Sequence, residues 1–261
     1  MPKRSFRIWR GDREGGQFEA FEAEVGEGMV VLDVILNIQA TQANDLGVRW
    51  NCKAGKCGSC SMEINGRPKL ACMTRMNSFP PEDMISVQPM KAFPVIKDLV
   101  TDVSWNYEKN TEIIPFKPKP RDADGHYRMY QEDVDRVQEF RKCIECYLCQ
   151  DVCHVLRDRD GKESFVGPRF MIRLASLEMH PLDDEDRVPE IRKWHGSGMC
   201  NITRCCTDVC PEGISITDNG IIPLKERVVD RYFDPFVALA RKVAGKSVRK
   251  EPREKKASVD G

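Results

Sequence analysis

The sequence has no excess of charge of either sign and no long hydrophobic run. Its 41 lysine and arginine residues equal its 41 aspartate and glutamate residues, so the formal net charge is zero. A balanced charge gives no electrostatic basis for binding nucleic acid. The most apolar stretch, residues 29–38, contains Asp33 and Asn37 and is shorter than the roughly 18 residues that a membrane-spanning helix needs. We therefore expect neither a nucleic-acid partner nor a transmembrane segment in this chain.

The N-terminus also lacks the apolar core of a secretory signal peptide. Alternating polar and apolar residues follow directly after Met1-Pro2-Lys3-Arg4. The 12 cysteines are therefore expected in a reducing compartment such as a bacterial cytoplasm, where disulfides are rare. Their spacing is that of metal sites and not of a disulfide framework. The sequence contains no glycine-rich nucleotide fingerprint and no Ser/His/Asp arrangement.

Residues 1–110 have the pattern of a small sheet with one helix. Residues 5–9 and 17–25 alternate polar and apolar side chains on either side of a glycine-bounded turn, which predicts a β-hairpin. Residues 29–43 change to a helical period, with one apolar stripe made of Val31, Val34, Ile35 and Ile38. The pair Asn65-Gly66 predicts a second hairpin, and residues 85–90 predict a last strand. This order of elements predicts an α+β fold with an N-terminal β-grasp ferredoxin domain.

Four cysteines of this domain have the spacing of a two-iron cluster. The run Cys52-x4-Cys57-x2-Cys60, followed by Cys72, is the ligand pattern of plant-type [2Fe-2S] ferredoxins. Two glycines inside the run permit positive φ and bring backbone N–H groups close to sulfur. Zinc also binds four thiolates, but usually through two well-separated C-x2-C pairs. We therefore predict these four cysteines as [2Fe-2S] ligands, with a zinc-stabilised interaction module as the alternative.

A second run, Cys143-x2-Cys146-x2-Cys149-x3-Cys153, has the pattern of bacterial ferredoxins. In that pattern three cysteines bind one iron–sulfur cluster and the fourth binds a second cluster. The run therefore predicts a C-terminal, helical, bacterial-ferredoxin-like domain with two clusters.

The partner run begins at Cys200 and departs from this template at one position. Cys206 and Cys210-Pro211 fall on the expected spacing, but Thr203 stands where the second thiolate is expected. A hydroxyl is a poor substitute for soft sulfur on iron. We therefore predict a three-iron cluster at this site.

The crossover of the fourth cysteine assigns eleven of the 12 cysteines. The predicted [4Fe-4S] ligands are Cys143, Cys146, Cys149 and Cys210, and the predicted [3Fe-4S] ligands are Cys153, Cys200 and Cys206. Cys205 is left over. We interpret it as a buried thiol in preference to a reserve ligand.

Repeated prolines mark residues 111–124 as a linker between the two domains. Residues 125–242 then form the helical domain. Predicted helices include residues 129–142, a helix that opens at Gly167, and residues 221–241, with Leu224, Val228, Tyr232 and Phe233 on the core side. Residues 243–261 are basic and polar and are predicted to be a disordered tail.

Two ferredoxin-like modules in this order, with these cysteine motifs, resemble the iron–sulfur subunit of the succinate dehydrogenase/fumarate reductase family over about residues 5–240. The resemblance implies the electron-transfer subunit of succinate:quinone oxidoreductase, respiratory complex II of the citric acid cycle. Electrons would pass from a flavoprotein subunit that contains FAD, through the two-, four- and three-iron clusters, to a quinone. No residue of this chain is expected to be catalytic, because the dicarboxylate site belongs to the flavoprotein.

The resemblance also implies a location and partners. The chain is expected at the cytoplasmic face of a bacterial plasma membrane, bound to membrane-anchor subunits, with a quinone, expected to be menaquinone, near the [3Fe-4S] cluster. His154 and Asn201 replace the proline and histidine that follow the corresponding cysteines in ubiquinone-linked members. The alternative within the family is a fumarate reductase that works with menaquinol.

Overall fold

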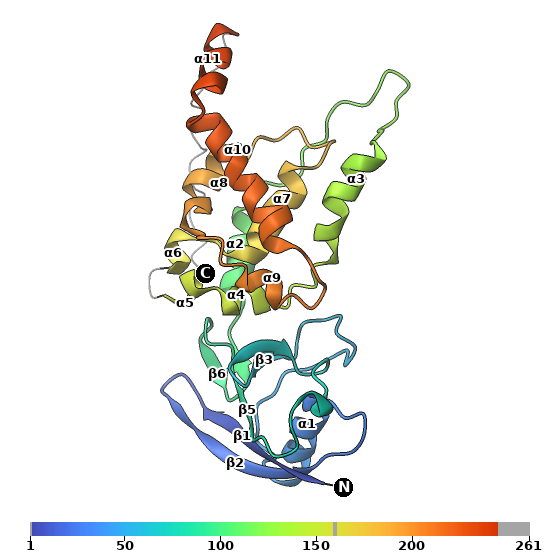
Figure 1. The fold of residues 1–261 in the computed structure, drawn as a ribbon, viewed down its shortest axis with the longest axis vertical. Coiled ribbons are helices and arrows are strands. Elements are labelled where there is room, and N and C mark those ends of the chain that lie inside the picture. Colours follow the sequence, from blue (N-terminus) through green and yellow to red (C-terminus); the bar gives the residue numbers. More distant parts are fainter. Residues whose placement is uncertain (1, 159–160, 245–261) are drawn as a thin grey trace. The chain divides into compact units, whose positions relative to one another are not determined.

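The computed structural model describes residues 2–158 and 161–244 (Figure 1). Contacts divide the chain into two compact units. The first unit contains residues 1–104 together with 144–152 and 209–212, and the second contains the remaining described residues. This division differs from the predicted linear boundaries, because two cysteine-bearing segments from the C-terminal half belong to the first unit. Most of the predicted tail, 243–261, lies outside the described residues.

A mixed five-stranded sheet forms the frame of the first unit. Its strands are β1 (Lys3–Gly11), β2 (Gly16–Glu24), β3 (Ser61–Ile64), β4 (Arg67–Leu70) and β5 (Ile85–Gln88), in the order β2-β1-β5-β3-β4. β1 runs parallel to β5, and the other neighbours are antiparallel. The strands β6 (Val95–Lys97) and β7 (Val100–Thr101) form a separate pair. Both predicted hairpins, β1–β2 and β3–β4, are confirmed.

The core of this unit forms where α1 (Val31–Thr41) buries its apolar side. All four predicted stripe residues are fully buried, as are Phe6 and Ile8 of β1. Alternation along β1 places Arg4, Phe6 and Ile8 on one face, as the two-residue period of a strand requires. The Asp33 carboxylate accepts a hydrogen bond from Val30 N (3.1 Å) and so satisfies a free amide at the start of the helix.

Asp98, which lies between β6 and β7, connects three segments of the first unit. Its Oδ1 atom accepts hydrogen bonds from Gly11 N (2.9 Å) and Arg10 Nε (3.1 Å), and its Oδ2 atom accepts one from Gly47 N (2.7 Å). The side chain is buried. Because Gly11 ends β1 and Gly47 follows α1, a single carboxylate orients the strand end, the loop after the helix and the β6–β7 turn.

The second unit is helical. Its helices are α2 (Ser104–Glu112, which begins at the unit boundary), α3 (Gln131–Gln138), α5 (His154–Arg157), α6 (Gly161–Ser164), α7 (Pro168–Glu178), α8 (Val188–Lys193), α9 (Cys205–Asp208), α10 (Ile222–Tyr232) and α11 (Pro235–Val243). The helix α4 (Leu148–Val152) belongs to the first unit. Short 3-10 helices span Met76–Ser78, Glu139–Lys142 and Ser197–Met199, and a π-helical segment spans Ile216–Ile221. The predicted combination of a sheet and helices is confirmed.

The helix α7 lies at the centre of the second unit. Phe170, Met171 and Leu174 are buried, and the π-helical segment packs against the same helix. Leu224 and Val228 of α10 are buried as predicted.

The single helix predicted for residues 221–241 is wrong. The chain forms two helices, since α10 ends at Tyr232 and Pro235 starts α11, where its missing N–H costs nothing. The Asp234 carboxylate accepts hydrogen bonds from Phe236 N (2.8 Å) and Val237 N (3.1 Å), which caps the new helix. Phe233, predicted to face the core, is 64% exposed because it follows the end of α10.

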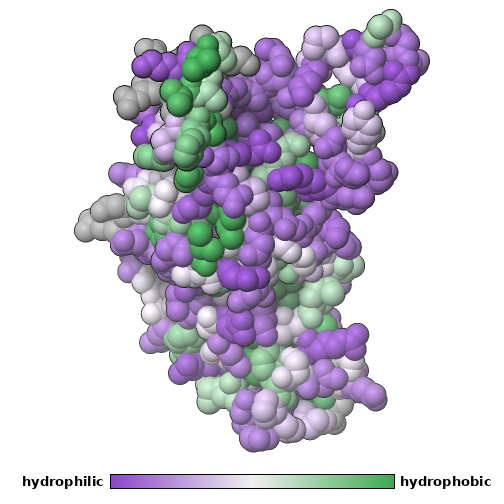
Figure 2. All heavy atoms as spheres, turned by 45° about the horizontal axis from the view of Figure 1, so that its top comes forward, coloured by the Kyte–Doolittle hydropathy of each residue, from purple (hydrophilic) through white to green (hydrophobic). Residues whose placement is uncertain are grey.

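An apolar strip made of Val229, Phe233, Phe236, Leu239 and Val243 is exposed along α10 and α11. Figure 2 shows hydrophobic side chains gathered over α11. Within residues 2–158 and 161–244, no helix combines the length and the apolar character needed to cross a membrane.

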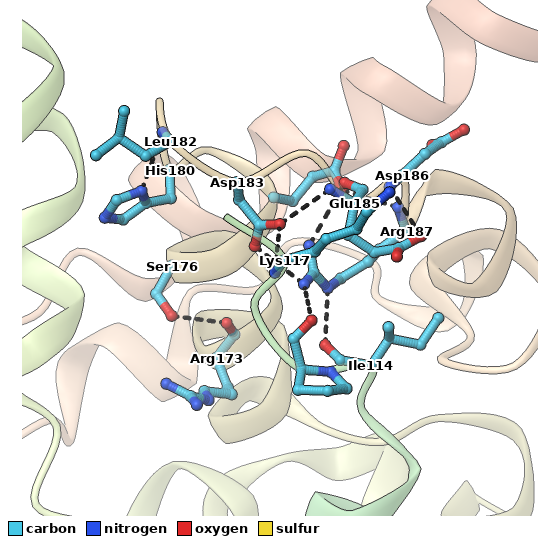
Figure 3. A network of polar contacts seen from close by, with 12 residues as sticks. Ile114, Lys117, Arg173, Ser176, His180, Leu182, Asp183, Glu185, Asp186 and Arg187 are labelled. Carbon is cyan, nitrogen blue, oxygen red and sulfur yellow. Dashed lines mark hydrogen bonds and ion pairs between the residues drawn. The ribbon is translucent and has the colours of Figure 1, made fainter. Parts of the chain in front are cut away.

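Arg187 holds the predicted linker against other residues of the second unit. Its guanidinium donates to the carbonyl oxygens of Ile114 (2.9 Å) and Pro115 (2.6 Å) and pairs with the Asp183 carboxylate at 3.0 Å, as Figure 3 shows for Ile114 and Asp183. Further backbone hydrogen bonds join Lys119 N to Leu182 O (2.9 Å) and Asp184 N to Lys117 O (2.8 Å). The proline-rich segment is thus bonded to residues 182–187 over much of its length, although its prolines exclude it from regular structure.

We predict that Asp98→Ala lowers the free energy of unfolding by more than about 2 kcal/mol, because each buried donor left without an acceptor costs about 1–3 kcal/mol. Asp45→Ala is the matched control. Asp45 bonds the same Arg10 at 2.6 Å but is exposed, so its loss is expected to be clearly smaller. Urea unfolding followed by circular dichroism measures both, and equal losses would contradict the role given to Asp98.

We predict that Arg187→Met destabilises the protein by about 3–5 kcal/mol, because it leaves the buried Asp183 carboxylate without its cation. It also removes donors from two linker carbonyls. Arg128→Met is the matched control. Arg128 pairs with Asp122 at 3.0 Å on the surface, so its substitution should have little effect on stability. Limited proteolysis within residues 113–121 should accelerate only in Arg187→Met; unchanged cleavage there would refute the link.

Candidate metal centre

The four predicted two-iron ligands all lie in the first unit. Cys52 and Cys57 belong to the irregular segment between α1 and β3, Cys60 immediately precedes β3, and Cys72 follows β4. The antiparallel pairing of Ser61 with Leu70 brings the last two cysteines together, and Cys72 N donates to Cys60 Sγ at 3.4 Å. The second hairpin therefore returns the chain so that Cys72 lies beside Cys60.

Backbone amides surround the sulfur atoms of this loop. Ala54 N and Lys56 N both donate to Cys52 Sγ at 3.3 Å. Cys52 N and Ser59 N both donate to Cys57 Sγ at 3.5 Å. Donors of this kind stabilise negative charge on sulfur, which is the state of a cysteine that binds iron.

The backbone reaches this arrangement through left-handed residues. Lys53, Gly55 and Gly58 have φ of +54°, +69° and +70°. A Cβ atom at Gly55 would lie 2.9 Å from Met73 Sδ, so the thioether rests directly on the loop. The two glycines are needed for their conformation and for the space that they leave.

The thiols of this group differ in their pKa values. Burial alone would raise the pKa of Cys57, but the hydrogen bonds from Cys52 and Ser59 outweigh it and lower that pKa to about 6. Burial raises the pKa of Cys60 to about 12, and the neighbouring thiols of Cys72 and Cys57 add to the effect. A bound metal deprotonates such a thiol outright. The sulfur surroundings therefore fit a group that takes thiolates as ligands.

In the part of the chain that the structure describes, no three His, Cys, Asp or Glu side chains are arranged as ligands of a single metal ion.

The seven remaining predicted ligands fall into two sets by unit. Cys146, Cys149 and Cys210 belong to the first unit, whereas Cys153, Cys200 and Cys206 belong to the second, as does Cys143. Cys210 is thus grouped with cysteines of the earlier run, and Cys153 with those of the later run. Cys143, predicted to join Cys146, Cys149 and Cys210, falls in the other unit, so this division does not test the predicted exchange of fourth cysteines, and the ligand assignment remains a prediction.

The two runs have the same local backbone. Residues on either side of Cys146, Glu145 and Tyr147, have φ of +55° and +61°, and those on either side of Thr203, Ile202 and Arg204, have φ of +63° and +65°. Few non-glycine residues adopt positive φ, and those that do are concentrated at functional sites, so four of them around Cys146 and Thr203 indicate a functional backbone conformation. A short helix follows in both runs, α4 in the first and α9 in the second. Thr203 therefore occupies the position that Cys146 has in the first run.

The C-terminal thiols are close enough to influence one another. Burial raises the pKa of Cys153, and the thiols of Cys205 and Cys200 raise it further. Burial also raises the pKa of Cys206 to about 11. The hydrogen bond between its sulfur and Thr217 Oγ1, 3.5 Å away, opposes this rise but is the weaker effect.

Cys205 differs from the prediction. It is half-buried at the first residue of α9, and its sulfur lies 3.3 Å from Thr203 Oγ1. His154, singled out beside Cys153, is exposed at the start of α5.

Sequence reasoning missed the residues that join the two-iron loop to the first cysteine run and to the residues after Cys210. Ser61 Oγ lies 2.8 Å from the carbonyl oxygen of Cys146, and Lys56 Nζ lies 3.1 Å from Glu212 Oε1. All of these residues belong to the first unit. The contacts join residues more than 80 positions apart, so no local pattern marks them.

Comparisons with known proteins agree with the two cysteine regions. A family model for the 2Fe-2S iron-sulfur cluster binding domain matches residues 5–108, and one for the 4Fe-4S dicluster domain matches residues 139–214. These ranges contain all the predicted ligands. The predicted two-iron and four-iron cluster domains are therefore confirmed.

Relatives and a solved structure are similar over most of the chain. An uncharacterized iron-sulfur protein of Methanococcus maripaludis is 31% identical over 91% of this chain, which spans 47% of that protein, about half its length. The fumarate reductase iron-sulfur subunit of Mycobacterium tuberculosis is 34% identical over 76% of this chain and 80% of its own length. A chain in the structure of the Mycobacterium smegmatis Sdh1 complex in the apo form has a TM-score of 0.86 and 59% identity, covering 89% of this chain and 98% of that chain.

Proposed function

This chain belongs to the family of iron–sulfur subunits of succinate dehydrogenase and fumarate reductase, and we propose that it is the electron-transfer subunit of a succinate:quinone oxidoreductase. The observation that carries the proposal is the combination of a two-iron cysteine loop with two further cysteine runs, each within a matching iron-sulfur family model. The chain transfers electrons between a flavoprotein subunit and a quinone, and the dicarboxylate reaction takes place on the flavoprotein.

The cysteines hold three clusters in this proposal. Cys52, Cys57, Cys60 and Cys72 bind [2Fe-2S]; Cys143, Cys146, Cys149 and Cys210 bind [4Fe-4S]; and Cys153, Cys200 and Cys206 bind [3Fe-4S]. Such clusters, when bound, accept and donate single electrons. The backbone N–H groups of Ala54, Lys56 and Ser59 stabilise the thiolates, and burial of Cys60, Cys153 and Cys206 keeps water from the sulfur atoms. These residues set the reduction potentials through hydrogen bonding and exclusion of solvent.

Fold and assembly follow the same family. The first unit has the β-grasp arrangement of plant-type ferredoxins, supported by its mixed sheet and single long helix, and the second has the helical arrangement of bacterial ferredoxins. The exposed apolar strip on α10 and α11 supports a position inside a complex, because large apolar patches on a protein surface usually mark interaction sites. The partners are a flavoprotein with FAD and membrane-anchor subunits at the cytoplasmic face of a bacterial membrane, with menaquinone as the acceptor.

The second candidate is the iron–sulfur subunit of a fumarate reductase that works with menaquinol. The similarity to the Mycobacterium tuberculosis fumarate reductase subunit favours it. Both candidates use the same electron path in opposite directions, so the ligand groups of this chain serve either one.

Purification of the native complex tests the proposed function. We expect a flavoprotein and membrane-anchor subunits to copurify with the chain, together with broad visible absorption and menaquinone. Succinate should reduce the clusters. If the second candidate holds, menaquinol should reduce the clusters and added fumarate should reoxidise them, with fumarate itself reduced to succinate. A colourless protein that contains zinc and no flavoprotein partner would overturn the proposal.

We predict that Thr203→Cys replaces the three-iron cluster by a four-iron cluster, because it restores the thiolate that the first run has at Cys146. The EPR signal of the oxidised three-iron cluster should disappear and the iron content should rise. Cys205→Ser is the control, since it changes a neighbouring thiol outside the predicted ligand set. Loss of the three-iron signal in Cys205→Ser would instead identify Cys205 as a ligand, and two four-iron clusters in the native chain would contradict the assignment.

A further inference from the structure

The segment 144–152, which carries two predicted four-iron ligands, is bound firmly within the first unit. Its Asp151 Oδ1 atom accepts a hydrogen bond from Ala92 N (3.0 Å). Phe93 and Tyr147 pack edge to face with their ring centroids 6.3 Å apart. These contacts are made by residues that are not predicted ligands, and they fix the segment that contains Cys146 within the first unit.

Gly58 brings the two-iron loop into direct contact with Cys146. A Cβ atom built on Gly58 would lie 2.7 Å from the Cα atom of Cys146, 3.0 Å from its Cβ atom and 3.1 Å from its nitrogen. Ordinary contacts between carbon atoms lie at about 3.5–4.0 Å. The backbone between the ligands Cys57 and Cys60 thus touches the backbone of Cys146, and only glycine leaves room for this contact.

Ser61 adds a hydrogen bond at the same place. Its Oγ atom lies 2.8 Å from the carbonyl oxygen of Gly58 and 2.8 Å from that of Cys146. A hydroxyl has one proton, so it donates to either carbonyl in turn or is shared between them. Ser61 is buried, which protects this hydrogen bond from competition by water.

The other connection between these segments is less suited to the same role. The Lys56–Glu212 ion pair joins the loop to the residues after Cys210, but the lysine side chain is 70% exposed. Exposed ion pairs of long side chains contribute little to fixing a geometry. By contrast, Gly58 contacts Cys146 through its backbone and Ser61 does so through a short, buried side chain, so both contacts have little freedom to move.

From these contacts we infer that Gly58 and Ser61 are positioning residues for electron transfer between the two-iron and four-iron ligand groups. The inference rests on the proposed function and concerns its first step within this chain, the transfer of an electron between the two-iron and four-iron groups. Ligand Cys57 is bonded to Gly58, ligand Cys60 is bonded to Ser61, and Cys146 lies across one backbone contact and one hydrogen bond. One electron leaves the two-iron side and the same electron reaches the four-iron side, with no transfer of atoms or protons.

Gly58→Ala tests this inference, with Gly66→Ala as the matched control. Both glycines have left-handed φ, +70° and +73°, so both substitutions carry the same conformational penalty. A Cβ atom at Gly66 would meet no atom within 4 Å, whereas at Gly58 it forces Cys146 away by about an ångström. The contact with Cys146 is therefore the steric difference between the two variants.

The measurement uses the purified complex with all its subunits. A light-triggered one-electron donor reduces the clusters, and rapid-freeze EPR follows the redistribution of the electron between the two-iron and four-iron signals. We expect the transfer to slow severalfold in Gly58→Ala, since electron tunnelling weakens steeply with each added ångström between donor and acceptor. Gly66→Ala should match the native complex. A redox titration should show unchanged potentials for both clusters, which separates a longer path from a changed driving force.

Ser61→Ala covers the case in which Gly58→Ala does not assemble. Ser61→Ala removes only the hydroxyl oxygen and introduces no clash, so we expect the complex to assemble. The hydrogen bond to Cys146 is lost. We expect a slower transfer in Ser61→Ala with both EPR signals intact. Equal transfer rates in the native complex, Ser61→Ala and any assembled Gly58→Ala would overturn the inference and leave the proposed function standing. Absence of cluster signals from the native complex would overturn the proposed function itself.

Discussion

Negative charge on cysteine sulfur is the constraint on which the rest of this structure depends. A thiolate in a protein interior needs hydrogen-bond donors or a cation, because burial favours the neutral thiol. In the two-iron loop, backbone amides of Ala54 and Lys56 supply those donors, and left-handed residues direct them towards Cys52. Where donors are fewer, as at Cys60 and Cys206, the raised pKa values mean that the bound metal itself must stabilise the thiolate. The cofactor and the fold of these loops are therefore coupled.

The second constraint concerns the two-iron loop and the segment around Cys146, which lie close together although they are distant in sequence. Two short segments of the C-terminal half, residues 144–152 and 209–212, belong to the sheet-containing unit, and the contact of Gly58 with Cys146 lies inside that unit. Within each unit a buried polar group fixes loops: Asp98 does so in the first unit and Arg187 in the second.

Local signals account for the parts of the fold that were predicted correctly. The apolar stripe of α1 and the Asn65-Gly66 turn each depend on side chains within a few residues, so the sequence pattern specifies them directly. The same reasoning should have found the break before Pro235, since proline at the first position of a helix is a start signal. Extending one helix through residues 221–241 gave the apolar periodicity more weight than the proline. The exposure of Phe233 and of Cys205 depends on where an element ends, and such ends are the least certain feature of a sequence pattern.

The sequence by itself determined the cysteine spacings and the departure from them at Thr203, and these spacings predict the ligand groups because iron–sulfur ligation requires thiolates at fixed positions along the chain. Only the tertiary structure decided which segments pack together: that the proline-rich segment is bonded to Arg187, that Cys146 belongs with the sheet, and that Gly58 must be glycine for space as well as for conformation. Those contacts join residues more than 70 positions apart. They arise from burial and hydrogen bonding between surfaces that exist only once the chain has folded, so no pattern of neighbouring residues encodes them.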